Sequence, residues 1–74
     1  MPVLIAPQNV DLTIIKVLVD DKTKKHLESL GITINEIVRV INSTDSSVIL
    51  LIKDTRLALD MSIATKIFVK EGNV

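Results

Sequence analysis

The residues of this sequence that could perform chemistry are few, and the most suggestive of them lie close together. His26 is the only histidine, and Asp20 and Asp21 precede it by a few positions. Imidazole nitrogens and carboxylate oxygens are ligands for divalent transition metals, so these three residues are the candidates for a metal site. Both aspartates have a second interpretation, because an aspartate that precedes a helix caps its free N–H groups. Capping is the favoured interpretation, with His26 on the surface, because nothing in the spacing makes these side chains converge.

No pattern of a catalytic site accompanies them. The chain has no cysteine, which removes thiolate chemistry and disulfides, and its two glycines cannot form a phosphate-binding loop. Its serines occur in no G-x-S-x-G nucleophile turn. The sequence therefore predicts a protein that is not an enzyme and requires no cofactor.

Composition narrows the class of partner. Lys plus Arg equals Asp plus Glu, 9 against 9, and Phe68 is the only aromatic residue. A protein that binds nucleic acid needs excess positive charge and aromatic side chains that stack on bases. We therefore do not expect nucleic acid to be a partner of this protein. No apolar run approaches the roughly 20 residues of a membrane span, and no signal peptide is evident, so we expect a cytoplasmic protein without direct membrane insertion.

The elements that position these residues are mostly strands. Branched apolar runs predict strands at 11–19, 36–41, 48–53, 56–59 and 66–70, with a helix at 22–30 and one helical turn at 61–65 capped by Asp60. Residues 42–47 are small and polar and form a hairpin loop. Residues 3–5 are an edge strand or an arm, and 71–74 a frayed tail. We predict a single domain over 1–74, with a core of about 11–70: a small, mostly β barrel of about five strands with one inserted short helix.

The end of the predicted helix is its best-defined feature. Leu27 and Leu30 share one helical face and should hold the helix against the core. Gly31 follows where a left-handed residue closes the last turn, which would bring Ile32 against Leu27. Asn35 is expected at a turn position with positive φ, which few residues other than glycine tolerate. These residues are assigned structural roles.

Two of the strands are apolar on both faces. A barrel of this size cannot bury both faces of 11–19 and 48–53, so part of them is either covered by residues 3–5 and the helix or exposed to a partner. Leu50 and Ile52 are therefore the apolar candidates for partner binding, and Lys24 and Lys25 of the helix are the charged ones. The same apolar faces would serve self-association into a homo-oligomer.

Several of these stretches, taken in order, resemble the FeoA family, the small cytoplasmic companions of the ferrous iron transporter FeoB. The resemblance extends over about residues 12–70 and lies in the following residues: Leu27-x-x-Leu30-Gly31-Ile32, Asn35, Ile37-Val38-Arg39-Val40, Arg56-Leu57-Ala58-Leu59, Ala64 and Ile67-Phe68-Val69. It implies an SH3-like β-barrel with an inserted helix and no enzymatic activity.

The role implied is that of an accessory protein that binds and modulates a FeoB-type transporter. A related domain ends the iron-dependent repressors, so the alternatives are a transition-metal-binding sensor, with iron as the metal, or an oligomerisation module. The sequence departs from the family pattern at three places. His26 replaces a usual arginine, Asn35 replaces a usual glycine, and the loop 42–47 replaces a Gly-Asp-Pro-like segment.

Overall fold

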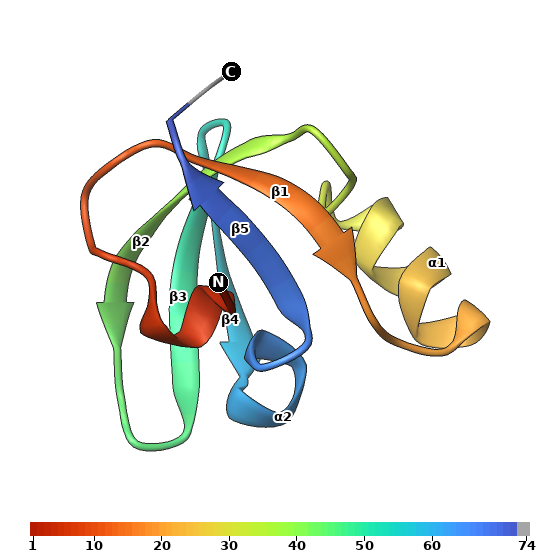
Figure 1. Cartoon of the computed structure of the whole chain (residues 1–74). Helices are drawn as coiled ribbons and strands as arrows, with labels where there is room; N and C mark the ends of the chain where they lie inside the picture. The colour runs from red at the N-terminus through yellow and green to blue at the C-terminus, as the bar shows by residue number, and fades with distance from the viewer. Residues whose placement is uncertain (73–74) are drawn as a thin grey trace.

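The computed structural model describes residues 1–72, and its main element is one antiparallel sheet of five strands (Figure 1). The strands lie in the order β4-β3-β2-β1-β5. Their bounds are β1 (Leu12–Val17), β2 (Ile37–Ser43), β3 (Ser47–Ile52), β4 (Thr55–Asp60) and β5 (Ile67–Glu71). Three short helices complete the fold: η1 (Val3–Ile5), α1 (Asp21–Ser29) and α2 (Met61–Ala64). The prediction of a small, mostly β, SH3-like fold with one short inserted helix is confirmed.

The core lies on the inner face of the curled sheet. Alternation along the strands places Val38 opposite Ile52 and Val40 opposite Leu50, and all four are buried. Each such aliphatic side chain contributes about 1.5–3 kcal/mol when it is removed from water. The remaining buried apolar residues are Val3, Leu12, Ile14, Leu27, Ile32, Val48, Leu59, Ala64, Ile67 and Val69.

The N-terminal segment lies over the core as an arm, which is one of the two arrangements predicted for it, and it is not an edge strand. Residues Val3–Ile5 form one turn of 3-10 helix, and the side chain of Val3 is fully buried. Pro2 makes an isolated antiparallel bridge to Phe68 of β5. This turn therefore supplies an aliphatic side chain to the buried core.

Both ends of helix α1 are closed by the predicted residues, although the helix covers Asp21–Ser29 and not 22–30. Asp20 caps it, because its carboxylate accepts a 3.0 Å hydrogen bond from the Thr23 N–H. At the other end, Gly31 has φ +98, its N–H donates to Glu28 O, and the N–H of Ile32 donates to Leu27 O. These two bonds form a Schellman closure. Asn35 also has the expected positive φ, at 72°.

One expectation about this helix is wrong. Leu27 is 3% exposed and packs in the core, but Leu30 is 38% exposed and does not hold the helix in place. Leu30 is the C-cap residue. The chain therefore leaves the helix at Leu30, and the helical spacing from Leu27 does not predict the direction of this side chain. A single buried leucine therefore attaches α1 to the core, and the helix lies to one side of the sheet (Figure 1).

Two β-bulges break the alternation of the sheet. The β1–β5 register shifts between Ile14 and Lys16, and the β2–β3 register shifts between Val40 and Asn42. In each case one strand carries an extra residue, which bends the strand and redirects its side chains. The extra residues are Ile15, which is exposed, and Ile41, which is half-buried.

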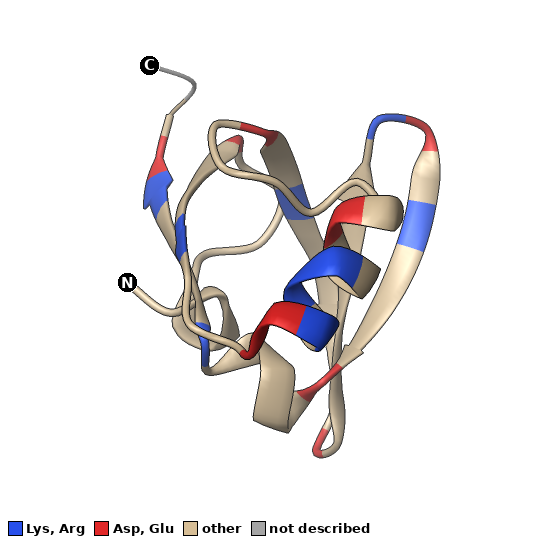
Figure 2. Cartoon of the chain, turned by 90° about the vertical axis from the view of Figure 1, so that its right-hand side faces the viewer, with Lys and Arg blue, Asp and Glu red and all other residues tan. Residues whose placement is uncertain are grey.

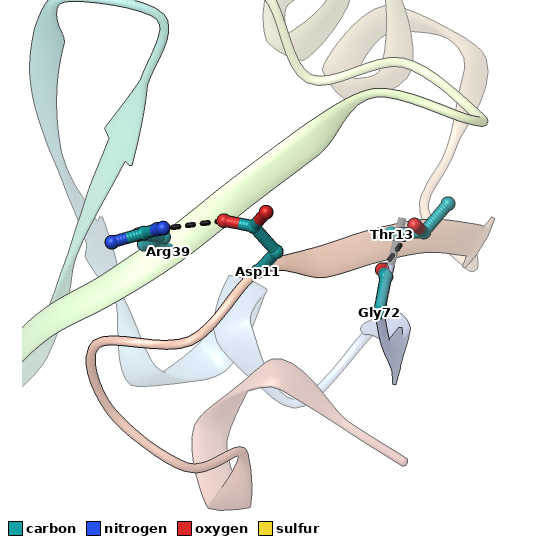
Figure 3. Close-up of polar contacts among 4 residues, drawn as sticks. All are labelled: Asp11, Thr13, Arg39 and Gly72. Atoms are coloured by element: carbon teal, nitrogen blue, oxygen red, sulfur yellow. Dashed lines mark hydrogen bonds and ion pairs between the residues drawn. The ribbon is translucent and has the colours of Figure 1, made fainter. Parts of the chain in front are cut away.

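The remaining boundaries differ in detail from the predictions. Asp60 occupies the N-cap position of α2, as predicted, but its side chain makes no capping hydrogen bond. Of the predicted frayed tail, Glu71 belongs to β5, and Gly72 is bonded in both directions: its N–H donates to Asp11 O, and its O accepts from Thr13 Oγ1 at 2.6 Å (Figure 3). The tail's last two residues, 73–74, lie outside the described part.

Candidate partner-binding surface

The three metal-ligand candidates lie on or beside α1 and do not form a ligand set. The Asp20 carboxylate is engaged as the helix cap, Asp21 is the first helical residue, and His26 lies exposed in the last turn. Hydrogen bonding by Thr23, through its side chain first and its backbone N–H second, lowers the pKa of the Asp20 carboxyl. Within residues 1–72, no group of three or more His, Asp or Glu side chains is placed to hold a metal ion.

Leu50 and Ile52, the two apolar candidates for partner binding, are corrected by the structure. Leu50 is fully buried and Ile52 is 3% exposed. Both point inward, because β3 buries every second residue and these two have the same parity as Val48. The apolar side chains of β3 that face outward are their neighbours, Ile49 and Leu51, which are half-buried.

The side chains of β2, β3 and β4 that point away from the core form a mixed apolar and polar surface, which we call the outer face. Cross-strand register aligns Arg39, Leu51 and Arg56 in one row. The next row contains Asn42, Ile49 and Ala58. Because paired residues of neighbouring strands project to the same side of a sheet, each row presents an apolar residue of β3 between side chains of the two flanking strands.

A shallow hollow of about 490 Å³ lies on this outer face. It is lined by Ile41, Asn42, Ile49, Arg56 and Ala58. Ala58 is the smallest of these side chains and stands between larger neighbours, which leaves the space. Ile41 reaches the hollow because it is the extra residue of the β2 bulge.

The two arginines of the outer face differ in their partners. Arg39 Nε donates a 2.7 Å hydrogen bond to Asp11 Oδ1, and both side chains remain partly exposed (Figure 3). Arg56 is exposed, and within the described chain no carboxylate lies within 4.0 Å of its guanidinium. The hollow therefore has an uncompensated positive group on its wall. Negative charges lie on both sides of Arg56 and Ala58 along the chain, at Asp54, two residues before Arg56, and at Asp60, two residues beyond Ala58.

The charged candidates, Lys24 and Lys25, are exposed on α1. Figure 2 shows acidic residues toward both ends of this helix and basic residues between them, so the helix carries charges of both signs along its length. Ile37, at the start of β2 with the same parity as Arg39, is a further exposed apolar side chain of the outer face. Outside β2–β4, exposed apolar side chains occur at Met1, Ile5, Ile15, Leu18, Leu30 and Ile34. Self-association through such residues stays a prediction.

The sequence reasoning missed the residues that line the hollow. In the predicted strand 56–59, Arg56 and Ala58 alternate with two leucines. This alternation could have indicated that Arg56 and Ala58 face outward. The contribution of Ile41 could not be found in the same way, because it depends on a bulge that shifts the register. Among the described residues, no helix has the length and apolar character needed to cross a membrane.

Comparison with known proteins gives the family of the chain. The model of the FeoA domain matches residues 1–71. A crystal structure of an iron uptake regulatory protein (FeoA) superimposes with a TM-score of 0.86 at 18% sequence identity, covering 96% of each chain. At this identity the superposition establishes the fold alone. The comparison with curated proteins gives no match. Because the family model spans almost the whole sequence, the chain belongs to the FeoA family.

Proposed function

We propose that this protein is a non-enzymatic accessory of ferrous iron uptake that acts in the cytoplasm by binding and modulating a FeoB-type transporter. The observation that carries the proposal is the match of the FeoA domain to residues 1–71. Further support comes from the name of a protein with a similar fold, an iron uptake regulatory protein.

The surface proposed for this contact is the outer face of β2–β4. Protein interfaces typically have an apolar centre with arginine among the enriched residues. Ile49 and Leu51 supply half-buried apolar area there, and Arg39 and Arg56 flank it. Lys24 and Lys25 lie on α1, so in this proposal they are not the centre of the contact.

Ferrous iron is the cargo of the transporter in this proposal and is not a ligand of the accessory protein. The alternative of a metal sensor needs three or more ligands in one place, and the candidates from the sequence are divided between a helix cap and an exposed last turn. Calorimetric titration with Mn²⁺ under reducing conditions separates the two functions. A saturable site tighter than about 1 mM would favour the sensor, since that is the range of weak oxygen-ligand sites.

Binding to the transporter is tested by capture on the immobilised protein. The detergent-solubilised FeoB-type transporter is applied under reducing conditions, with GDP or a non-hydrolysable GTP analogue supplied. We expect retention by the wild type, and loss of retention when Ile49→Lys places a charge on the outer face. Ile15→Lys is the matched control, because Ile15 is an exposed isoleucine on β1 and should tolerate the change.

The result that would contradict the proposal is a wild-type protein that retains no transporter with either nucleotide. Retention by the Ile49→Lys variant at the level of the Ile15→Lys control would place the contact elsewhere. Ferrous uptake by cells that lack the accessory gene provides the functional readout, with the Ile15→Lys variant restoring uptake and the Ile49→Lys variant failing to restore it.

A further inference from the structure

The hollow of the outer face combines a small floor, apolar walls and one free cation. Ala58 lies between Ile49 and the edge of β4, and the exposed Arg56 stands two residues before it on the same strand. An occupant that fits must fill apolar space and supply a negative charge beside it.

The protein already contains an example of the charged half of such a contact. Asp11 precedes β1 and binds Arg39 through Nε at 2.7 Å, in the same row of the sheet as Arg56. Arginine binds carboxylates more strongly than neutral acceptors, because both partners of the hydrogen bond are charged. No carboxylate of the described residues takes this role at Arg56.

The spacing of Arg56 and Ala58 defines the shape of the occupant. Residues two apart in an extended strand lie on one face, about 6.6 Å from each other. An extended segment that runs over β4 with the same spacing can direct a carboxylate to Arg56 and a large apolar side chain into the hollow over Ala58. Acidic residues flank both ends of this pair, Asp54 before Arg56 and Asp60 after Ala58, so Arg56 alone attracts the carboxylate. The position of Arg56 relative to Ala58 therefore sets the order of the two side chains.

We infer that the hollow recognises an extended protein segment in which an acidic residue and a large aliphatic residue are separated by one position. The acidic residue pairs with Arg56, and the aliphatic residue lies among Ile41, Ile49 and Ala58. This inference rests on the proposed function only in assigning the segment to the cytoplasmic part of the transporter. The chemistry of recognition is argued from the hollow itself.

The first test uses short peptides, with binding followed by amide and methyl chemical shifts of the labelled protein. The probe is the capped peptide Thr-Glu-Thr-Leu-Thr, and the controls replace its Glu by Lys or its Leu by Ser. We expect saturable shifts at Ile41, Ile49 and Ala58 with the probe, and binding about tenfold weaker with each control, which corresponds to the loss of one charged or apolar contact.

Variants of the protein then test each half of the contact. Arg56→Glu should weaken the probe at least tenfold and should restore binding of the Lys control peptide, whereas Lys70→Glu, the same charge change on β5, should not. Ala58→Leu fills the hollow and should abolish binding. Thr55→Leu is its control, because Thr55 belongs to the same strand at the opposite parity. Arg56→Gln is the milder substitute if the charge reversal unfolds the protein, as judged from the spectrum.

The outcomes separate this inference from the proposed function. Binding of the probe that is unaffected by Arg56→Glu or Ala58→Leu, or shifts confined to other surfaces, would overturn the inference. Retention of the transporter by both variants at the wild-type level would overturn it as well and leave the proposed function standing. If the wild type binds the probe but retains no transporter, the inference stands and the proposed function fails. Binding to phosphatidylglycerol vesicles that depends on Arg56, without binding of the probe, would assign the hollow to a membrane surface and overturn the inference.

Discussion

Asp11 accepts a 2.7 Å hydrogen bond from Arg39, and this contact ties the start of β1 to the middle of β2 on the outer face (Figure 3). The two side chains are 36% and 50% exposed. An ion pair this exposed contributes little to folding, because water screens it. Its consequence is for binding, since it leaves Arg56 as the outer-face arginine that has no acidic partner among the described residues.

Asp11→Asn should therefore change stability by less than about 1 kcal/mol while strengthening the binding of an acidic segment to the outer face. The released Arg39 adds a second cation to the same row, for a gain of roughly twofold, equivalent to a few tenths of a kcal/mol at a solvent-exposed site. The same peptide titration measures it. Glu36→Gln is the control, because it removes a carboxylate that lies 3.9 Å from Lys53. A weaker affinity for Asp11→Asn would contradict the prediction.

Leu50 and Leu51 are neighbours in β3 whose truncation should have different effects. Leu50→Ala leaves a cavity beneath the sheet, and the expected loss is about 2–5 kcal/mol in the free energy of unfolding. Leu51 is half-buried on the outer face, so Leu51→Ala should cost about 1 kcal/mol or less, in proportion to the apolar area that it removes. Urea denaturation of both variants provides the comparison. Equal losses would mean that the outer face is covered in the isolated protein.

Gly31 and Gly72 allow the backbone cost and the steric cost of a side chain to be separated. Both have positive φ, at 98° and 96°, but a Cβ on Gly31 would meet Ile52 Cγ2 at 3.2 Å, and a Cβ on Gly72 would meet nothing within 4 Å. Each alanine variant carries the strain of a left-handed residue, roughly 1 kcal/mol. Gly31→Ala should be the more destabilising by thermal unfolding, and Gly72→Ala measures the backbone part alone. The reverse order would refute the packing of Gly31 against β3.

Because the Asp20 carboxylate caps α1, we expect the stability of the protein to depend on pH. Its pKa is lowered from 3.8 in the folded protein by hydrogen bonding with Thr23. A carboxyl whose folded pKa lies below its unfolded value stabilises the folded state above the unfolded pKa, and this contribution disappears as pH falls through the folded pKa. The difference in melting temperature between wild type and Asp20→Ala should therefore be largest near neutral pH and shrink below about pH 3.8.

The control for this experiment is Asp21→Ala, because Asp21 lies in the first turn and shows no capping bond. Its effect at neutral pH should be the smaller of the two. A difference for Asp20→Ala that stays constant down to pH 2.5 would mean that the charge of the cap contributes nothing.

Local chemistry explains which parts of the fold could be read from the sequence. Gly31 and Asn35 were predictable, because a positive φ restricts the residue type at a single position. The inward orientation of Leu50 was not, because all residues from Val48 to Ile52 are apolar and a uniform run contains no parity. A shift of one residue moves every side chain of a strand to the opposite face of the sheet. For this reason Leu50 and Ile52 were predicted on the partner-binding face, which in the structure carries Ile49 and Leu51.

The outer-face hollow was out of reach of the sequence for a different reason. It is assembled from three strands, and it needs the register of each pair to bring Arg56 and Ala58 opposite their neighbours on β3. It also needs Ile41 to leave the regular alternation of β2. The composition of one strand at a time cannot specify either of these relationships.

The bulges at Ile15 and Ile41 have a consequence for comparing this chain with distant relatives. The extra residue of a bulge is not paired with the neighbouring strand. Its removal therefore leaves the side chains before and after it on the same faces of the sheet. Alignments should therefore place single-residue gaps at these two positions without penalty. Because Ile41 belongs to the hollow and not to the core, a lineage can gain or lose that wall of the hollow by a one-codon insertion or deletion and keep the same buried residues.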